Sequence, residues 1–386
     1  MRRLRAVAAL LVAAALAGCE APARTLTLAA ALLPSELPAY RTVLDDFERA
    51  HGWRVVVVPQ QYADIRRALA AEAVAGAGTL DLVELDIYSL AAAARDVTQL
   101  DEAGLAAELA ALAAAPLQAG RIDGLRFLPH RLTWQALIYD HAALGAPPGT
   151  WDELLAVARA HPGRIGIKGA LYEGLTCDVL PFVWAAGGSG VAFDDAGARA
   201  AFRLFAALAP ALNRQSATFR EASIAEAMAR GELVLHLNWP FAMSLFAAQG
   251  RAPRPLRSAP LPRGPAGTAT VLGGGYLAIP RGAPHPRMAL ALARYLLGAA
   301  AQQALHERLG WFSARRDVAT GDGDELLAGF AALRDAVRPR PELPDYALLS
   351  RLWQDAFRAV AFQRVAPETA LADAAARWAA RPRRGG

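Results

Sequence analysis

The stretch that decides the fold runs from residue 25 to residue 85, and three pieces of it read TLTLAA (25–30), RVVVV (54–58) and LDLVEL (80–85). Each piece is short, apolar and rich in residues that favour strands. The segments between them show the 3.6-residue apolar spacing of helices, the first through Val43 and Phe47 and the second over residues 64–75. This alternation predicts a parallel or mixed sheet covered on both faces, with ligands at the carboxyl ends of the strands.

A second α/β unit follows in the chain. Strands are predicted over residues 126–128, 136–139, 233–237 and 276–279, and the remainder to Trp378 is mostly helical apart from a Pro-rich break at 339–344. Two capping boxes mark helix starts, Thr150 with Glu153 and Ser223 with Glu226. The predicted fold class is therefore α/β.

The N-terminus has the layout of a secretory signal. Three arginines precede an uncharged apolar run over residues 6–16, which is too short to span a bilayer comfortably. The run ends in Leu16-Ala17-Gly18-Cys19, which resembles the lipobox of bacterial lipoproteins. We therefore expect residues 1–18 to be a signal peptide, Cys19 to carry the lipid anchor and residues 19–24 to form a tether.

Composition narrows the class of protein further. The net charge is +5, part of which belongs to the signal, and no basic patch interleaved with aromatic residues indicates nucleic-acid binding. The chain has two cysteines, so acylation of Cys19 would leave Cys177 without an intramolecular disulfide partner. No later apolar stretch is long enough to span a membrane. The chain is long enough for two lobes with separate cores.

Catalytic and metal-binding motifs are missing from the sequence. The seven histidines include no pair spaced i, i+4 and no zinc-like spacing with cysteine, so we expect no metal and no cofactor. There is no GxSxG elbow, no P-loop and no GxGxxG after a strand. We expect that the protein is not an enzyme, although the sequence leaves open a pair of glycosidase carboxylates.

Several segments, in order and spacing, carry a family resemblance. They are residues 80–86, 100–101, 128–129, 137–140, 150–154, 225–231, 273–280, 289–297, 302 and 310–315. Together with the lipobox, they resemble the extracellular solute-binding family of ABC sugar importers, which includes maltose- and trehalose-binding proteins. Residues 172–177 are similar to a stretch in binders of trehalose- and maltose-like disaccharides.

The resemblance implies a two-lobed, type II periplasmic-binding-protein fold whose chain crosses between lobes three times. We place the crossings near residues 129–133, 272–276 and 311–315. The N-terminal lobe would comprise residues 25–129 and 272–315. The C-terminal lobe would comprise residues 130–271 and 316–380.

The function implied by the resemblance is capture of a carbohydrate, such as a trehalose- or maltose-like disaccharide, for an ABC importer. The expected partners are the sugar, the permease subunits and, through the lipid, the membrane. We expect a monomer, exported and anchored at the periplasmic or extracytoplasmic face of the cell envelope. A non-sugar solute on the same scaffold, or a sensory lipoprotein, remains an alternative.

Candidate ligand-binding residues follow from their positions. Sugars present apolar C–H faces and hydroxyl groups, so their sites combine aromatic rings with carboxylates, amides and arginines. Core packing is the alternative for each aromatic residue and a solvated loop for each charged residue, and Gly273–Gly275 could equally form a hinge. The candidates at strand ends, loops and crossings are Glu36, Gln61, Asp86, Trp134, Tyr172, Glu173, Trp239, Gly274, Tyr276, Trp311 and Arg315.

Overall fold

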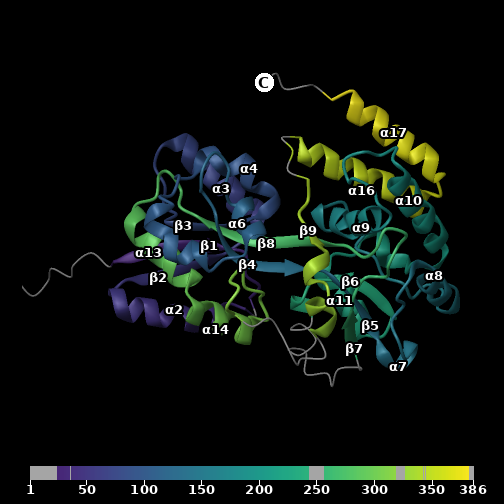
Figure 1. Cartoon of the computed structure of the whole chain (residues 1–386), viewed down its shortest axis with the longest axis horizontal. Helices are drawn as coiled ribbons and strands as arrows, with labels where there is room; N and C mark the ends of the chain where they lie inside the picture. Colours follow the sequence, from purple (N-terminus) through teal and green to yellow (C-terminus); the bar gives the residue numbers. More distant parts are fainter. Residues whose placement is uncertain are drawn as a thin grey trace, which may run out of the picture.

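The structure is a computed structural model that describes residues 24–34, 36–242, 256–318, 327–341, 343 and 345–381. The chain forms two lobes side by side, each with its own sheet (Figure 1). The predicted signal peptide (1–18), Cys19 and all of the predicted tether except Arg24 lie outside the described residues.

The N-terminal lobe is built on a sheet with the strand order β2-β1-β3-β8-β4, to which the short strand β9 (Val337–Arg338) adds by pairing in parallel with the start of β8. Strands β1 (Thr25–Ala30), β2 (Arg54–Pro59) and β3 (Leu82–Asp86) are parallel, and β8 (Thr270–Ala278) lies antiparallel to both β3 and β4 (Leu128–Trp134). Because Val83 pairs with Ala278 and Asp86 with Gly275, β3 runs toward the start of β8. The carboxyl ends of the three parallel strands therefore face the second lobe.

The helices of this lobe follow the apolar periodicity of the sequence. Helix α2 (Leu37–His51) has a proline in its first turn, buries Tyr40, Val43, Leu44 and Phe47, and ends at Gly52, whose φ of 65° suits glycine. The other helical segments are α3 (Tyr62–Ala75), η1 (Ile87–Ser89), α4 (Leu90–Ala93), η2 (Ala94–Asp96), η3 (Ala103–Leu105), α5 (Ala106–Ala110), α6 (Ala114–Ala119), α13 (Pro286–Leu297) and α14 (Ala299–Leu309).

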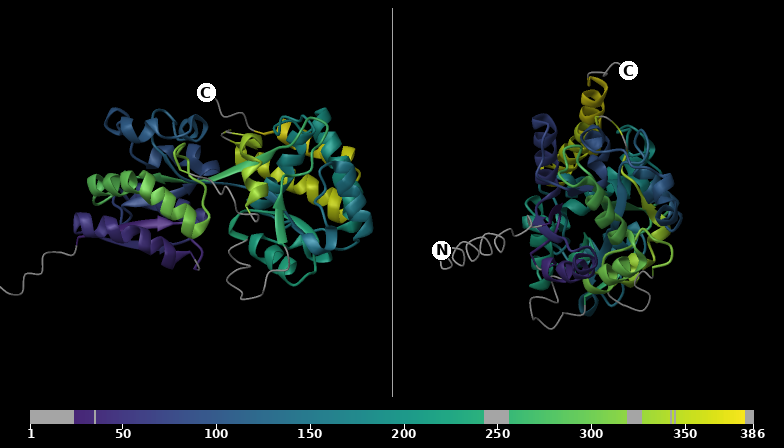
Figure 2. Two further views of the ribbon diagram at one scale, coloured as in Figure 1. Left: turned by 60° about the horizontal axis from the view of Figure 1, so that its bottom comes forward. Right: turned by 90° about the vertical axis from the view of Figure 1, so that its left-hand side faces the viewer.

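The C-terminal lobe surrounds an antiparallel sheet with the order β6-β5-β7 (Figure 2). The strands are β5 (Ala136–Asp140), β6 (Leu235–Asn238) and β7 (Leu256–Ala259). Its helical segments are α7 (His141–Leu144), α8 (Trp151–Ala160), α9 (Glu173–Ala185), α10 (Ala196–Leu208), η4 (Ala209–Ala211), η5 (Arg214–Ala217), α11 (Glu221–Ala229), α15 (Ala328–Ala331), η6 (Arg334–Ala336), α16 (Tyr346–Gln363) and α17 (Pro367–Ala379).

Two strand connections between the lobes can be followed directly. Gln135 is the one residue between β4 of the first sheet and β5 of the second. Strand β8 begins beside Gln135, where the Thr270 hydroxyl donates to the Gln135 carbonyl at 2.8 Å, and runs into the first sheet. The chain also returns to the C-terminal lobe after Val318, because Gly329 of α15 donates its N–H to Ser258 of β7. The predicted two-lobed type II α/β fold is confirmed.

Local predictions fared differently at the two capping boxes. The Thr150 hydroxyl accepts from the N–H of Glu153 at 3.3 Å, so that cap is confirmed. The prediction that Ser223 caps α11 is wrong, because this helix begins at Glu221 and Ser223 lies in its first turn. There the Ser223 hydroxyl accepts from the N–H of Arg220 at 2.9 Å.

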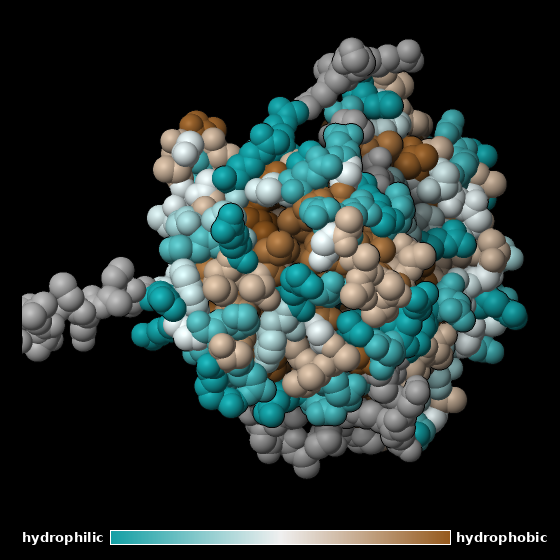
Figure 3. Space-filling model, turned by 60° about the vertical axis from the view of Figure 1, so that its left-hand side comes forward, coloured by the Kyte–Doolittle hydropathy of each residue, from teal (hydrophilic) through white to brown (hydrophobic). Residues whose placement is uncertain are grey.

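No helix among the described residues is both long and apolar enough to cross a membrane. Figure 3 shows one face of the molecule, on which hydrophobic side chains lie in a hollow surrounded by polar ones.

Candidate functional site

An arginine connects the two lobes through two of the predicted ligand-binding residues. The guanidinium of Arg340 lies 2.9 Å from Oδ1 of Asp86, at the end of β3. It also lies 2.8 Å from Oε1 of Glu173, in the first turn of α9. Asp86 belongs to the N-terminal lobe and Glu173 to the C-terminal lobe, so these carboxylates face each other across the molecule. We call Asp86, Tyr88, Glu173, Arg340 and Tyr346 the interlobe site.

The charge of Arg340 is held by its surroundings. Its side chain is 3% exposed and lies over the ring of Tyr88, 4.9 Å from the ring centroid. Burial opposes the charge, but the surrounding acidic groups outweigh burial and raise the pKa of Arg340 well above its usual value. The Nε of Arg340 is buried and has no hydrogen-bond partner among the described residues. The Nε–H of Arg340 is therefore a buried donor of the interlobe site that no described residue accepts from.

Glu173 is fixed by helix α16 of its own lobe. The hydroxyl of Tyr346 donates to Oε1 of Glu173, and the hydroxyl of Ser350 donates to Oε2 at 2.7 Å. Both donors lie on α16, and Glu173 lies in the first turn of α9, where a negative charge is favoured by the helix dipole. The carboxylate is therefore held in one orientation by donors on α16.

Asp86 differs from Glu173 in how its charge is balanced. Burial raises the pKa of Asp86, although Arg340 and the N–H of Tyr88 both favour the ionised form. The Tyr88 N–H lies 3.3 Å from Oδ1 of Asp86. Because Glu173 also repels a charge on Asp86, the ionised form of Asp86 depends on Arg340.

A second polar cluster lies inside the N-terminal lobe. Glu84 of β3 is fully buried, and its carboxylate contacts Nε of Arg131 at 3.0 Å and Nδ1 of His130 at 3.2 Å. It also accepts from the N–H of Ala31 at 3.0 Å. Burial opposes ionisation, but Arg131, His130 and the backbone donor outweigh burial and lower the pKa of Glu84. This cluster joins the end of β1 to β3 and β4, and Glu84 lies two residues before Asp86 on β3.

Trp311 and Glu36 meet beside this cluster. The indole N–H of Trp311 donates to Oε1 of Glu36 at 3.0 Å. Arg131 lies over the Trp311 ring, 4.2 Å from its centroid, and the residue is 8% exposed. In this structure the indole is therefore occupied by protein groups.

The C-terminal lobe contributes further aromatic side chains. Tyr172 precedes α9, and the guanidinium of Arg220 lies over its ring at 4.4 Å. Trp239 follows β6, is half-buried, and packs against Gly273 of β8. Leu171, beside Tyr172, is 42% exposed. Tyr172 directly precedes Glu173 in the chain, and Trp239 contacts the strand that joins the lobes.

The three glycines of β8, Gly273 to Gly275, are packed so closely by neighbouring groups that a side chain would not fit at any of them. A Cβ at Gly275 would lie 1.9 Å from the Glu84 carboxylate, and one at Gly273 would lie 2.9 Å from the Trp239 ring. At Gly274 it would lie 2.9 Å from the carbonyl of Arg131. The glycines thus let Glu84 and Trp239 approach the strand that joins the lobes.

Four predicted residues lie elsewhere in the structure. Trp134 stacks on Phe312 and donates to the carbonyl of Phe330 at 2.7 Å. Tyr276 is fully buried and donates to the carbonyl of Pro116 at 3.0 Å. Arg315 is engaged with Asp317 and the Leu297 carbonyl, and Gln61 is exposed at the start of α3.

Three residues of the interlobe site, Tyr88, Arg340 and Tyr346, were missed by the sequence analysis. Arg340 and Tyr346 lie in or next to the Pro-rich break at 339–344, and Tyr88 lies two residues beyond Asp86. Prolines favour an extended backbone, and an extended segment can carry a side chain such as that of Arg340 to the other lobe, so the Pro-rich break was the available signal.

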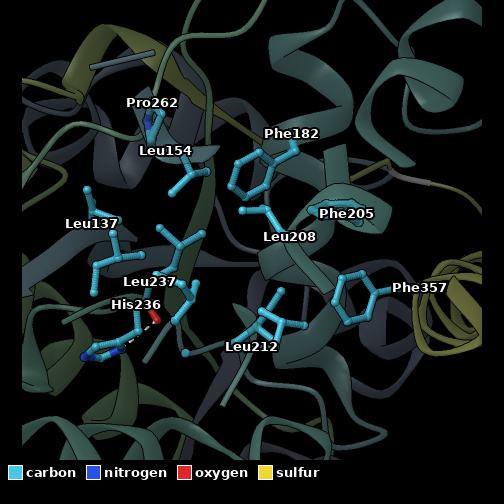
Figure 4. A pocket seen from close by; sticks show the side chains of 14 residues that line it. Leu137, Leu154, Phe182, Phe205, Leu208, Leu212, His236, Leu237, Pro262 and Phe357 are labelled. Atoms are coloured by element: carbon cyan, nitrogen blue, oxygen red, sulfur yellow. Dashed lines mark hydrogen bonds between the residues drawn. The ribbon is translucent and has the colours of Figure 1, made fainter. Parts of the chain in front are cut away.

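A small cavity lies in the core of the C-terminal lobe. It measures about 40 Å³ and is lined by apolar side chains, with His236 at its edge (Figure 4). Burial, assisted by the charge of Lys168, lowers the pKa of His236 to about 3, so its ring is neutral. The cavity is far too small and apolar for a sugar and is a packing defect of the core.

The fold and the interlobe site define a solute-binding protein of the two-lobed type II class. A family model described as "Bacterial extracellular solute-binding protein" matches residues 42–328, and the chain belongs to this family. The family binds solutes and is not a family of enzymes, in agreement with the sequence analysis. A relative from Deinococcus radiodurans, described as a probable ABC transporter-binding protein, is 29% identical over 339 residues, covering 78% of this chain and 79% of the relative.

Solved structures of similar fold cover nearly the whole chain. Maltose-bound MalE3 of T. maritima is 23% identical, with a TM-score of 0.81 over 92% of this chain and 99% of that one. A solute-binding protein of Thermotoga lettingae bound to α-D-tagatose is 23% identical, with a TM-score of 0.79 over 92% and 98%. The mannotriose-bound protein CpMnBP1 is 15% identical, with a TM-score of 0.77 over 92% and 99%.

Proposed function

We propose that this protein is a lipid-anchored solute-binding protein that captures a carbohydrate, such as a maltose- or trehalose-like disaccharide, for an ABC importer. The observation that carries the proposal is the interlobe site, where a fixed carboxylate, a second carboxylate and an arginine meet between aromatic rings. The similar structures that hold maltose, tagatose and mannotriose, and the relative named for ABC transport, support it.

The chemistry of the interlobe site suits a polyhydroxylated ligand. Carboxylates accept from sugar hydroxyls and an arginine donates to them, while aromatic rings pack on the C–H faces. Asp86, Glu173 and Arg340 supply the polar groups, and Trp239 and Tyr172 supply the nearby rings. Each lobe contributes one carboxylate, so a bound sugar would favour the closed arrangement of the lobes.

The remaining assignments belong to the same proposal. The partners are the carbohydrate, the permease subunits and the membrane through the lipid, with no nucleic acid. The protein acts as a monomer at the periplasmic or extracytoplasmic face of the cell envelope.

A thermal-shift screen of the chain from Glu20 onward tests the proposed function. A ligand that binds only the folded state raises its apparent stability. Maltose, trehalose, tagatose and mannotriose are the first probes, with spermidine and inorganic phosphate as non-sugar controls. Stabilisation by a sugar alone supports the proposal, whereas stabilisation by a non-sugar alone overturns the carbohydrate assignment.

The lipid anchor gives the first testable prediction. Cys19→Ser removes the thiol that accepts the diacylglyceryl group, so the protein should no longer fractionate with membranes. The matched control is Cys177→Ser, because Cys177 is a buried cysteine of the C-terminal lobe and should leave fractionation unchanged. Membrane association of Cys19→Ser equal to that of the parent would contradict the anchor.

Trp239 gives the second prediction. Trp239→Ala should weaken sugar binding by about 1–3 kcal/mol, the scale of one buried apolar side chain. Isothermal titration calorimetry measures the change. Trp378→Ala is the control, since Trp378 is also half-buried in the C-terminal lobe but lies on α17. Equal losses in both variants would assign Trp239 to general packing.

A further inference from the structure

The chain contains a single lysine. Lysine and arginine together number 41, and Lys168 is the only lysine among them. Every other strongly basic side chain is an arginine, and most of these are exposed or partly exposed. Lys168 is instead fully buried in the C-terminal lobe. A buried charge is stable only when it is paired and hydrogen-bonded, so the partners of this amine indicate its role.

The ammonium of Lys168 has an acceptor for each of its three protons. Nζ lies 2.6 Å from Oδ1 of Asp178, which is also fully buried. It donates to the carbonyl of Leu237 at 3.0 Å. With the Gln135 amide oriented to satisfy both its neighbours, its oxygen accepts from Nζ at 3.2 Å. Three donors thus meet three acceptors.

Asp178 is satisfied in the same way. Its Oδ2 accepts from the backbone N–H of Lys168 at 3.0 Å, and its Oδ1 accepts from the Gln135 amide nitrogen at 3.0 Å. Gln135 is the residue between β4 and β5, and its carbonyl accepts from Thr270 of β8. The ion pair therefore holds Gln135, where the chain crosses from β4 to β5. Through the carbonyl of Gln135 it also holds β8, the second strand that crosses between the lobes.

The same network reaches both sides of the C-terminal part of the proposed binding site. Asp178 lies on α9, five residues after Glu173, and Leu237 lies two residues before Trp239. We propose that Lys168 is a positioning residue: its ammonium fixes Gln135, α9 and the end of β6 as one rigid unit, about which the lobes open and close. The proposal rests on the two-lobed fold and does not depend on the identity of the ligand.

Arginine cannot replace this lysine. A lysine ammonium places three donors around one atom, whereas a guanidinium spreads five donors over a larger plane. In a fully buried site the extra donors of arginine would have no partners and the extra volume no space. We therefore expect Lys168→Arg to disrupt the unit even though it keeps the charge.

Two variants that should still fold distinguish a positioning role of Lys168 from a contribution to stability alone. Replacing a buried ion pair with apolar residues of similar size is often neutral for stability, so Lys168→Met combined with Asp178→Leu should fold. Gln135→Met leaves the ion pair and removes only its link to the crossing. Both should show at least tenfold faster amide hydrogen exchange at residues 134–137 and 237–240 without ligand. Exchange in α13, in the other lobe, should be unchanged and serves as the internal control.

The unsubstituted chain from Glu20 onward offers an independent readout with an amine-reactive ester, because its amines are the N-terminal amine and the side chain of Lys168, the one lysine of the sequence. Lys168 should be modified at least a hundredfold more slowly than the N-terminus, at the same rate with and without maltose. Unchanged exchange at the crossing in both folded variants overturns the proposal, as does ready labelling of Lys168 in the native protein. Lack of maltose binding by the parent would count against the proposed ligand but would leave both readouts valid.

Discussion

Glu84→Ala is expected to lower the free energy of unfolding by about 3–5 kcal/mol, the scale of breaking a buried ion pair by removing one partner. The substitution leaves the Arg131 guanidinium, with 13% of its side chain exposed, without its carboxylate. It also removes the acceptor for the N–H of Ala31 and the partner of His130. Urea unfolding followed by circular dichroism measures the change.

A surface pair provides the matched control for Glu84. Glu102 lies 2.8 Å from Arg121, and both side chains are more than a third exposed. Surface ion pairs contribute about 0–1 kcal/mol, so Glu102→Ala should change the unfolding free energy by no more than that. Similar losses in both variants would show that burial adds nothing to the Glu84 cluster.

The pH dependence of stability tests the same cluster. The pKa of Glu84 is lowered in the folded protein, so its contribution is present above its unfolded pKa and is lost as pH falls through its folded pKa. The parent should therefore lose stability in acid relative to Glu84→Gln, which cannot ionise. Parallel stability curves for the two proteins below pH 5 would contradict the depressed pKa.

The strands and helices of the first lobe were predictable because their signals are local. Apolar spacing alone indicated β1 at residues 25–30 and a helix through Val43 and Phe47. The cap at Thr150 depends on a residue three positions away and was also found. Ser223 matched the same pattern, but the helix begins at Glu221, three residues earlier than a cap at Ser223 predicts. Such one-turn errors are usual where a helix offers two polar starts.

The sequence predicted some residues of the interlobe site but missed those whose partners lie far away along the chain. Asp86 could be chosen because it lies at the end of a predicted strand, and Glu173 because residues 172–177 resemble a stretch in disaccharide binders. Arg340 could not, because its partners lie 254 and 167 residues away. The buried, ionised state of Glu84 was unpredictable for the same reason, because it depends on Arg131, which lies 47 residues further along the chain. The sequence also singled out Gly275, but it gave no sign that the Glu84 carboxylate packs against this glycine and leaves no room for a side chain.

Arg340→Met should open the ligand-free protein, since it removes the cation between two carboxylates that belong to different lobes. Asp86 and Glu173 would then repel each other, and small-angle scattering should give a larger radius of gyration than the parent. The variant also lacks the arginine donor for the sugar hydroxyls, so sugar affinity should fall by about 1.5–3 kcal/mol in calorimetry, the scale of a hydrogen bond to a charged group. Arg338→Met is the control, because Arg338 is an exposed arginine on β9 two residues away.

Acid distinguishes charge repulsion from simple loss of packing in this variant. Burial raises the pKa of Asp86, and removing Arg340 takes away the main group that lowers it, so Asp86 binds a proton at a higher pH than an ordinary aspartate. Protonated Asp86 can donate to Glu173 instead of repelling it. The radius of gyration of Arg340→Met should therefore shrink toward the parent value as pH falls through the raised pKa of Asp86. A radius that stays large in acid, or one that equals the parent at neutral pH, would show that Arg340 does not hold the lobes together.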